Sequence, residues 1–256
     1  MSNKRQEIIN RQFGFRQVLQ LLTEISEIGE VRKGRSDPEF KDFQRYVADT
    51  RYILKALKEK SKVLDVGAGA GIFSIALARL GFDVTATDLV PKGITEFHFF
   101  RKFGCAFVPT NLDEWQLPFS NEAFDAILCL HVIEHLRKPL LALVDFKRVL
   151  RPGGTLILMT PNGSITSIYK KLLPDKNLQN TGHIREYTPK ELVHMLMFSG
   201  FEICDIAYSN EMVSASLLDI PQRIKRLLVH GYCFFCNLLP AISYEIHITA
   251  KAEETK

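Results

Sequence analysis

The feature that most constrains the fold is a glycine-rich turn directly after a short apolar run. Val63–Val66 is followed by Gly67, Gly69 and Gly71, and an apolar stretch with helical spacing comes next. Because glycine has no Cβ, such a turn can bend sharply and let a ligand approach the backbone closely. An apolar strand, a glycine turn and a helix in this order are typical of several kinds of nucleotide-binding α/β protein.

Strand-like and helix-like segments alternate along the rest of the chain, and this pattern predicts βαβ units with a parallel sheet covered on both faces. The expected fold class is therefore α/β, a doubly wound Rossmann-like sheet. We expect an N-terminal helical cap over residues 1–60, a main domain over 61–256, and within it a helical insert at 210–241. After the first apolar run, strands are expected at 82–88, 106–108, 126–130, 155–159 and 201–208.

Composition narrows the class of protein. The chain has 256 residues, of which 46% are hydrophobic and 24% charged, as in ordinary globular proteins rather than disordered chains. Its net charge of +4 is too small to indicate a dedicated nucleic-acid binder. The five cysteines are scattered and the first residues are polar, without the pattern of a signal peptide. We therefore expect reduced thiols and a cytoplasmic location.

An uncharged stretch of 18 residues, Leu227–Tyr244, reaches the lower length limit of a membrane span. It contains Pro240, and from Ile242 onward apolar and polar residues alternate with a period of two. This alternation predicts a half-buried strand with one face toward solvent, rather than a transmembrane helix.

Two acidic residues restrict the ligand of the glycine turn. Asp65 lies within the first strand, where it would repel a pyrophosphate but attract a ligand that carries an ammonium or sulfonium group. Asp88 ends the next strand, where a carboxylate can accept hydrogen bonds from both hydroxyls of a ribose. Asp65, together with GxGxG spacing in place of GxGxxG, disfavours a nicotinamide dehydrogenase. For Asp88, a helix N-cap is the structural alternative.

Five segments taken in order resemble class I S-adenosylmethionine-dependent methyltransferases, over about residues 62–209. This resemblance implies a seven-stranded sheet whose last strand, Tyr244–Ala250, is antiparallel, and S-adenosyl-L-methionine as the cofactor. The segments are VLDVGAGAG, ATDLV, NLDEWQLPF, FDAILCLHVIEHL and LRPGGTLILMTPN.

The same resemblance implies the cofactor-binding residues. Asp65 and the turn would hold the methionine part, Asp88 the ribose, and Asp113 the adenine amino group, unless Asp113 is only a solvated loop residue. Leu130 and His131 would lie near the sulfonium. The complete predicted set is Asp65, Gly67, Ala68, Gly69, Gly71, Asp88, Leu89, Asp113, Glu114 and Leu130.

Histidines are the candidates for acid–base chemistry, which methyl transfer needs only when the acceptor must lose a proton. His131, Glu134 and His135 have the spacing of one helix face. A catalytic base at His131 or His135, a structural role in holding the loop, and a metal site all remain open. The segment resembles the Glu-x-x-Glu-His of ubiquinone-type O-methyltransferases, which implies a divalent ion. Because Mg²⁺ prefers a carboxylate where this chain has His131, we expect no metal.

A third candidate histidine, His183, begins the segment His183–Pro189, which resembles a segment of related methyltransferases. Thr188 and Pro189 have the pattern of a helix start, so a structural role for Arg185–Pro189 is expected. His183 is a candidate substrate contact or base. The segment after 126–130 lacks the Asn/Asp-Pro-Pro-Tyr/Phe motif of many enzymes that methylate amide or base nitrogens, which also disfavours nucleic acid as a partner.

The insert carries leucines at helical spacing with interleaved basic residues, Arg223, Lys225 and Arg226. It predicts either a substrate-side lid or, over 213–239, an interfacial helix that contacts the inner face of a membrane peripherally. The predicted function is S-adenosylmethionine-dependent O-methylation of a small-molecule, glycan or lipid-linked acceptor. The alternative is a non-catalytic cofactor-binding subunit that regulates or scaffolds a partner. The acceptor and the oligomeric state are not specified by the sequence.

Overall fold

The computed structural model describes residues 20–21, 41–89, 100–114, 116–172, 182–209, 239 and 243–253. Strands and helices alternate through most of this length, as the sequence predicts. The elements are α3 (Lys41–Ala56), β1 (Lys62–Val66), α4 (Ile72–Arg79), β2 (Asp83–Asp88), β3 (Ala106–Pro109), β4 (Phe124–Leu130), the 3₁₀ turn η1 (Ile133–His135), α6 (Pro139–Val149), β5 (Leu150–Pro161), α7 (Gly163–Leu172), α9 (Pro189–Phe198), β6 (Phe201–Ser209) and β7 (Glu245–Ala252).

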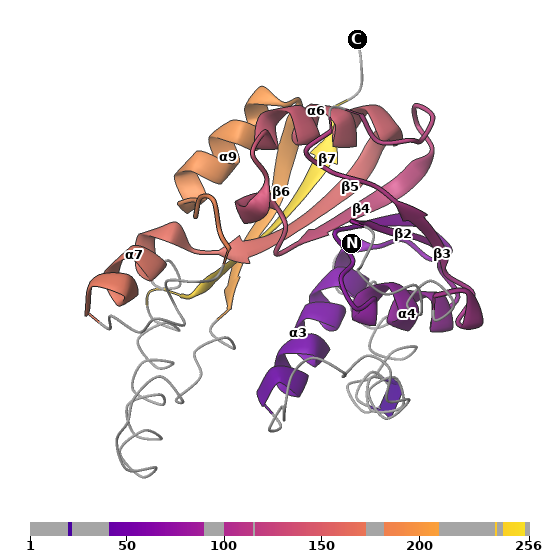
Figure 1. Cartoon of the computed structure of the whole chain (residues 1–256), viewed down its shortest axis with the longest axis horizontal. Coiled ribbons are helices and arrows are strands. Elements are labelled where there is room, and N and C mark those ends of the chain that lie inside the picture. Colours follow the sequence, from indigo (N-terminus) through magenta and orange to yellow (C-terminus); the bar gives the residue numbers. More distant parts are fainter. Residues whose placement is uncertain are drawn as a thin grey trace.

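The seven strands form one sheet in the order β3-β2-β1-β4-β5-β7-β6. Strand β7 runs antiparallel to both of its neighbours, and the other pairs in the sheet are parallel. Helices α6 and α9 cover one face of the sheet, and α3 and α4 cover the other (Figure 1). The doubly wound fold class and the antiparallel last strand are therefore confirmed.

Each face of the sheet has its own apolar core, because successive side chains of a strand point to opposite faces. On β4, Ile127 and Cys129 pack toward α6 and α9, whereas Ala126 and Leu128 pack toward α3 and α4. Helix α3 contributes Val47, Ile53 and Leu54 to the second core. It thus shares a core with the sheet, and the domain boundary at residue 60 stays a prediction.

The carboxyl ends of the parallel strands meet at one edge of the sheet, and the strand order reverses on either side of β1. Ligands of open α/β sheets bind at such a reversal. Strand β7 is antiparallel, so its first residues lie at this same edge. Glu245 pairs with Pro161 and His247 with Met159, near the end of β5. The edge therefore combines the glycine turn with the start of the last strand.

The alternation of apolar and polar residues in the last strand does not separate a buried face from a solvent-exposed face. Ile246 and Ile248 are buried in the α6–α9 core, but Glu245 and His247 on the other face are also buried, with 0% and 4% exposure. The prediction of a strand half-exposed to solvent is wrong, because α3 covers the polar face. The His247 ring packs edge-on against Tyr52 of that helix.

Some predictions fall outside the described residues. These are most of the N-terminal cap, almost all of the insert at 210–241, and the uncharged stretch 227–244 as far as Ile242, except Leu239. Within the part of the chain that the structure describes, no helix is both long and apolar enough to cross a bilayer.

Candidate functional site

The glycine turn uses a backbone conformation that side chains rarely adopt. Gly67 and Gly71 have φ values of +66° and +77°, in the left-handed region. A side chain would also have no room at either position. A Cβ on Gly67 would lie 2.4 Å from Val132 Cγ2, and one on Gly71 would lie 2.4 Å from Phe100 Cε1. Only glycine fits at these two positions, so the turn packs tightly against Val132 after β4 and against Phe100 before β3.

The middle glycine is different, because a Cβ there would meet nothing within 4 Å. The amide of Gly69 donates to Asp88 Oδ2 at 2.7 Å, and the amide of Leu89 donates to Asp88 Oδ1 at 2.6 Å. The amides of Gly67 and Ala68 both donate to the Thr87 carbonyl. Turn and strand end therefore form one hydrogen-bonded unit, with an open backbone surface at Gly69.

Asp65 lies beneath this turn and is 2% exposed. Its Oδ2 accepts a hydrogen bond of 2.5 Å from Ser74 Oγ of α4. Burial raises the pKa of Asp65 to about 7, the Ser74 hydrogen bond opposes this rise, and Asp88 adds to it. A cationic group bound above the turn would favour the ionised carboxylate.

The other predicted cofactor contacts flank the same edge. Asp113 follows β3, and its Oδ1 accepts a hydrogen bond from the Arg137 amide at 2.7 Å, which connects it to the segment after β4. Glu114 beside it is exposed. Leu89 is 59% exposed, whereas Leu130 at the end of β4 is 8% exposed.

These residues fit S-adenosylmethionine. The open backbone at Gly69 allows close approach, and the buried Asp65 favours a cationic ligand. A carboxylate has about four acceptor positions. The hydrogen bonds from Gly69 and Leu89 use one position on each oxygen of Asp88, which leaves capacity for the hydroxyls of a ribose. The role of each individual residue remains a prediction.

The segment after β4 is not the helix that the spacing suggested. His131 has φ = +55°, and only a single 3₁₀ turn, Ile133–His135, follows it. Glu134 is consequently 0% exposed, while His135 is exposed. The prediction that His131, Glu134 and His135 share one helix face is wrong, because a left-handed residue turns the chain at the end of the strand.

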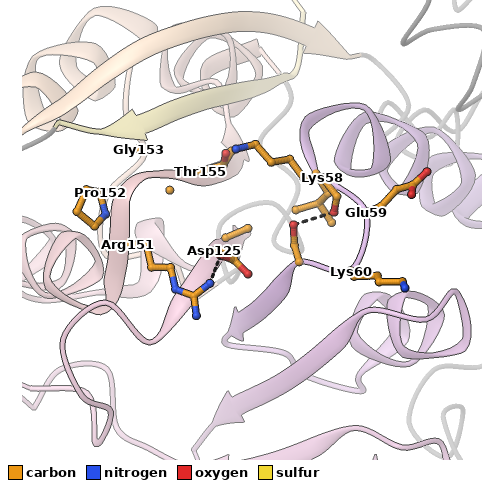
Figure 2. Close-up of a pocket in the computed structure, with 12 residues that line it drawn as sticks. Lys58, Glu59, Lys60, Asp125, Arg151, Pro152, Gly153 and Thr155 are labelled. Atoms are coloured by element: carbon orange, nitrogen blue, oxygen red, sulfur yellow. Dashed lines mark hydrogen bonds and ion pairs between the residues drawn. The ribbon is translucent and has the colours of Figure 1, made fainter.

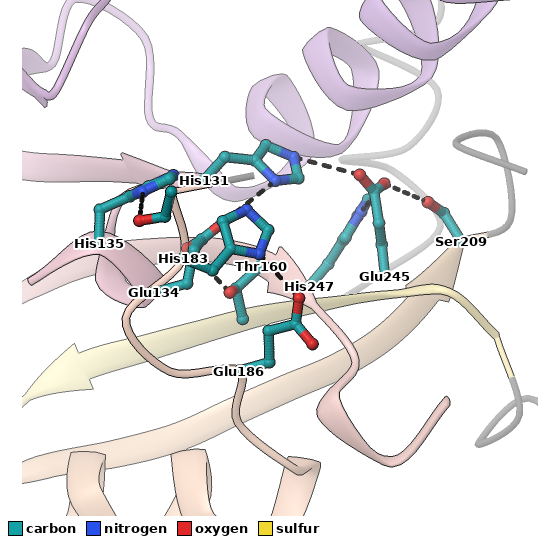
Figure 3. A network of polar contacts seen from close by, with 10 residues as sticks. His131, Glu134, His135, Thr160, His183, Glu186, Ser209, Glu245 and His247 are labelled. Atoms are coloured by element: carbon teal, nitrogen blue, oxygen red, sulfur yellow. Dashed lines mark hydrogen bonds and ion pairs between the residues drawn. The ribbon is translucent and has the colours of Figure 1, made fainter. Parts of the chain in front are cut away.

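His131 lies between two buried carboxylates (Figure 3). Its Nε2 is 3.2 Å from Glu245 Oε1 on β7, and its Nδ1 is 3.6 Å from Glu134 Oε1. Both carboxylates are anchored, because Thr160 Oγ1 donates to Glu134 and Ser209 Oγ donates to Glu245. The imidazole therefore joins the end of β4 to the start of β7.

His183 has a partner of a different kind. Its Nδ1 lies 2.8 Å from Glu186 Oε1, and Thr166 Oγ1 donates to Glu186 Oε2 at 2.6 Å. Because an ionised carboxylate can only accept, Nδ1 carries the proton of a neutral His183 ring and Nε2 keeps a lone pair. A histidine oriented in this way by a carboxylate has the arrangement of a general base.

The loop that carries His183 is attached to the turn after β4. The Glu134 carbonyl accepts from the amides of Ile184 and Arg185, and His135 Nδ1 lies 3.1 Å from the Gly182 carbonyl. The rings of His135 and His183 meet edge to face, with centroids 4.8 Å apart. The structure therefore brings the two histidines together, as Figure 3 shows.

The predicted helix start after this loop is confirmed. Helix α9 begins at Pro189, and Thr188 caps it through a complete capping box with Glu191. The Thr188 side chain accepts from the Glu191 amide, and the Glu191 carboxylate accepts from the Thr188 amide. These hydrogen bonds lower the pKa of Glu191.

One possible metal-binding group lies here. Donor atoms of Glu134, His135 and His183 lie within 4.8 Å of one another. The third donor of such a site, besides Glu134 and His135, would be His183 and not His131. Mixed carboxylate and imidazole donors could hold a divalent ion.

Several functional candidates in this region are not predicted from the sequence. Glu186 and Thr166 orient His183, and Glu245 holds His131, but none of the three was predicted as a site residue. The sequence signal for Glu245 is the alternation of polar residues in the last strand, but this pattern predicts that they face solvent.

A surface pocket lies at the opposite edge of the sheet (Figure 2). It is lined by residues 57–61 after α3, the start of β4 and the start of β5, where Arg151 pairs with Asp125. Parallel sheets bind ligands at the carboxyl ends of their strands, so this pocket is not the expected site. The irregular start of β5, with Gly153 at φ = +68°, forms part of its wall.

Sequence comparison defines the class. Residues 40–206 match the family described as a methyltransferase domain, so the chain belongs to this family. It is 30% identical over 159 residues to the ubiquinone biosynthesis O-methyltransferase of Xanthomonas campestris pv. campestris (strain B100), across 57% of this chain and 65% of that protein. The corresponding Xylella fastidiosa (strain M23) protein is 32% identical over 158 residues, across 57% and 63%. The chain therefore spans somewhat under two thirds of these relatives.

Solved structures agree with the fold. A SAM-dependent methyltransferase from Archaeoglobus fulgidus has a TM-score of 0.58 at 18% identity, covering 82% of this chain and 94% of its own. A [4+2]-cyclase has a TM-score of 0.61 at 18% identity, covering 94% and 97%. Family and fold together imply S-adenosyl-L-methionine as the cofactor. The cyclase shows that the fold does not by itself specify the reaction.

Proposed function

We propose that this chain transfers a methyl group from S-adenosylmethionine to a hydroxyl oxygen of a small-molecule acceptor. The observation that carries the proposal is the His183–Glu186 pair, at 2.8 Å, on a loop attached to the turn after β4. A base is needed for oxygen acceptors, whose proton must leave, and the pair has the geometry of one. The curated relatives, which are named O-methyltransferases, support the same acceptor atom.

In this proposal His183 is the base. Its Nδ1–H donates to Glu186, which leaves the Nε2 lone pair for the acceptor hydroxyl proton. When bound, S-adenosylmethionine supplies a methyl group that is already activated on a sulfonium. The protein then needs only to align the acceptor oxygen and remove its proton.

His131 has a different part in the proposal. Both of its ring nitrogens face buried carboxylates, at 3.2 Å and 3.6 Å, so neither is directed toward an acceptor. It acts as a positioning residue that holds the end of β4 against the start of β7. His135 likewise holds the His183 loop through the Gly182 carbonyl.

The acceptor class within this proposal is a hydroxyl-bearing small molecule, because the relatives are named as O-methyltransferases of ubiquinone biosynthesis. A glycan or a lipid-linked precursor is the other acceptor class. For a lipid-linked acceptor, residues 213–239 would contact the membrane surface peripherally. Co-sedimentation with anionic liposomes, with and without residues 213–239, tests this; equal sedimentation of both proteins rejects membrane contact.

The central experiment is a turnover assay of the purified protein with S-adenosylmethionine and a panel of phenols and catechols. S-adenosylhomocysteine formation is measured for the wild type, for His183→Gln, and for His194→Gln, an exposed histidine on α9 that serves as the control. We expect a loss of turnover in His183→Gln alone. Cofactor binding without turnover on any acceptor would instead support the non-catalytic subunit.

A further inference from the structure

The polar face of β7 forms a buried cluster with helix α3. Asp49 of α3 and Glu245 and His247 of β7 are 1%, 0% and 4% exposed. Glu245 and His247 lie on the same face of the strand, two residues apart, and the helix lies over that face. Neither the predicted cofactor contacts nor the His183–Glu186 pair uses any of these three side chains.

Two distances within the cluster are compatible with a metal site. His247 Nε2 lies 3.7 Å from Asp49 Oδ1 and 3.6 Å from Glu245 Oε2, too far for hydrogen bonds. Two donors at about 2.1 Å from a tetrahedral ion lie about 3.4 Å apart, close to these separations. All three donor atoms lie within 4.8 Å of one another.

An independent observation concerns His247. Its Nε2 is buried, points toward the two carboxylates, and makes no hydrogen bond with any residue in the described ranges. A buried imidazole nitrogen without a hydrogen bond is costly unless something else occupies its lone pair or its proton. A metal ion between the three side chains would use that lone pair.

Neighbouring side chains hold the cluster in place. Ser209 Oγ donates to Glu245 Oε2 at 2.8 Å, and the Tyr52 ring packs edge-on against the His247 ring at 5.0 Å. Tyr52 is itself fixed, because Thr249 Oγ1 donates to its hydroxyl at 3.0 Å. Such surrounding contacts orient the ligands of metal sites in proteins.

We propose that Asp49, Glu245 and His247 bind one divalent transition-metal ion of the zinc type, which joins α3 to β7. One imidazole nitrogen and two carboxylate oxygens suit such an ion, whereas Mg²⁺ and Ca²⁺ prefer oxygen donors alone. The site is separate from the Glu134, His135 and His183 group. It does not depend on the methyl-transfer proposal.

One side chain, Glu245, would connect the ion to the candidate catalytic region. Glu245 directs Oε2 toward His247 and Oε1 toward His131 Nε2, at 3.6 Å and 3.2 Å. Figure 3 shows the Glu245 carboxylate between the two histidines. Metal binding would therefore fix the carboxylate that positions His131.

The test is direct metal binding to the full chain, stripped with a chelator and then titrated with Zn²⁺ or Co²⁺ alone. Stoichiometry is measured by elemental analysis, affinity by calorimetry, and ligation by the visible spectrum of bound Co²⁺. We expect one equivalent, a rise in Tm with metal, and at least about tenfold weaker binding in the nearly isosteric Asp49→Asn and in His247→Gln.

The matched control is His135→Gln, which removes an exposed histidine of the other donor group. It is expected to bind one equivalent with wild-type affinity. No bound ion, wild-type affinity in a folded His247→Gln or Asp49→Asn variant, or loss of the ion in His135→Gln instead would overturn the proposal. If His247→Gln does not fold, Glu245→Gln replaces it. The wild-type Co²⁺ spectrum needs no variant, and a spectrum without nitrogen ligation would equally overturn the proposal.

Discussion

The carboxyl edge of the sheet has two halves that are built by different means. The proposed cofactor half, around β1 and β2, is made by backbone: amides of Gly67, Ala68 and Gly69 hydrogen-bond to the end of β2. The proposed acceptor half, around the ends of β4 and β5, is made by side chains, with His183 held by Glu186. A backbone turn is encoded locally by glycines, whereas a side-chain network depends on residues brought together only by the fold.

The prediction with the largest expected effect uses turnover and cofactor affinity to distinguish the two halves. His183→Gln removes the proposed base and should lower kcat about 10²- to 10⁴-fold, with little change in cofactor affinity. Glu186→Gln should lower kcat less, because it alters only the orientation of His183. Turnover is followed by S-adenosylhomocysteine release and affinity by calorimetry. A parallel loss of cofactor affinity would mean that the halves are not separate.

A second prediction concerns the backbone of the cofactor half. Gly67→Ala should lower the free energy of unfolding by roughly 2–5 kcal/mol, combining left-handed strain with overlap against Val132. Gly69→Ala is the matched control, since it also has positive φ but meets no atom within 4 Å. It should cost only about 1–2 kcal/mol. Urea unfolding measures both, and equal losses would refute the close approach to Val132.

The third prediction uses the buried carboxyl below the turn. The pKa of Asp65 is raised from 3.8 to about 7, so the folded protein binds more protons than the unfolded chain between these values. Its contribution to stability is therefore favourable at low pH and decreases as pH rises from about 4 to 7. Asp65→Asn should match the wild type at pH 4 and exceed it by about 2–4 kcal/mol at pH 8.

Urea titrations at several pH values measure this difference, and the exposed Asp83→Asn on β2 is the control, with no comparable change expected. A flat difference between wild type and Asp65→Asn across the pH range would show that burial does not control this carboxyl. It would also weaken the preference of the turn for a cationic ligand.

The smallest effect tests how the acceptor half is supported. Thr188→Ala removes the cap of α9, directly after the His183 loop, and should cost about 1 kcal/mol at pH 7. Because the capping hydrogen bonds lower the pKa of Glu191, the cost should shrink as pH falls and that carboxylate is protonated. Ser167→Ala, an exposed hydroxyl on α7, is the control. Thermal unfolding at pH 7 and pH 3 distinguishes them.

The cofactor half could be predicted from the sequence because its determinants are close together. The apolar strand, the three glycines and Asp88 lie within residues 63–88, and the structure brings them together as expected. The seven-stranded sheet and its antiparallel last strand followed from the family resemblance. These features depend on local spacing and on a recurring chain path.

The acceptor half could be predicted only in part. His183 was a candidate, but its partner Glu186 matters through a hydrogen bond that spacing does not reveal. The left-handed conformation of His131 prevents the expected helix face, and no residue type in that segment predicts this conformation. The polar face of β7 was misjudged because the sequence does not show that α3 covers it.

The position of β7 has a consequence for the order in which a growing chain can assemble. The strand is the last in sequence, yet it lies between β5 and β6. A nascent chain that ends before Glu245 already contains β1 to β4 and the glycine turn, but its β5 edge is open and β6 has no neighbour in the sheet. Exposed strand edges are sites of aggregation. The cofactor half can thus form during synthesis, whereas the acceptor half and its protected edge are completed only when the final strand is inserted.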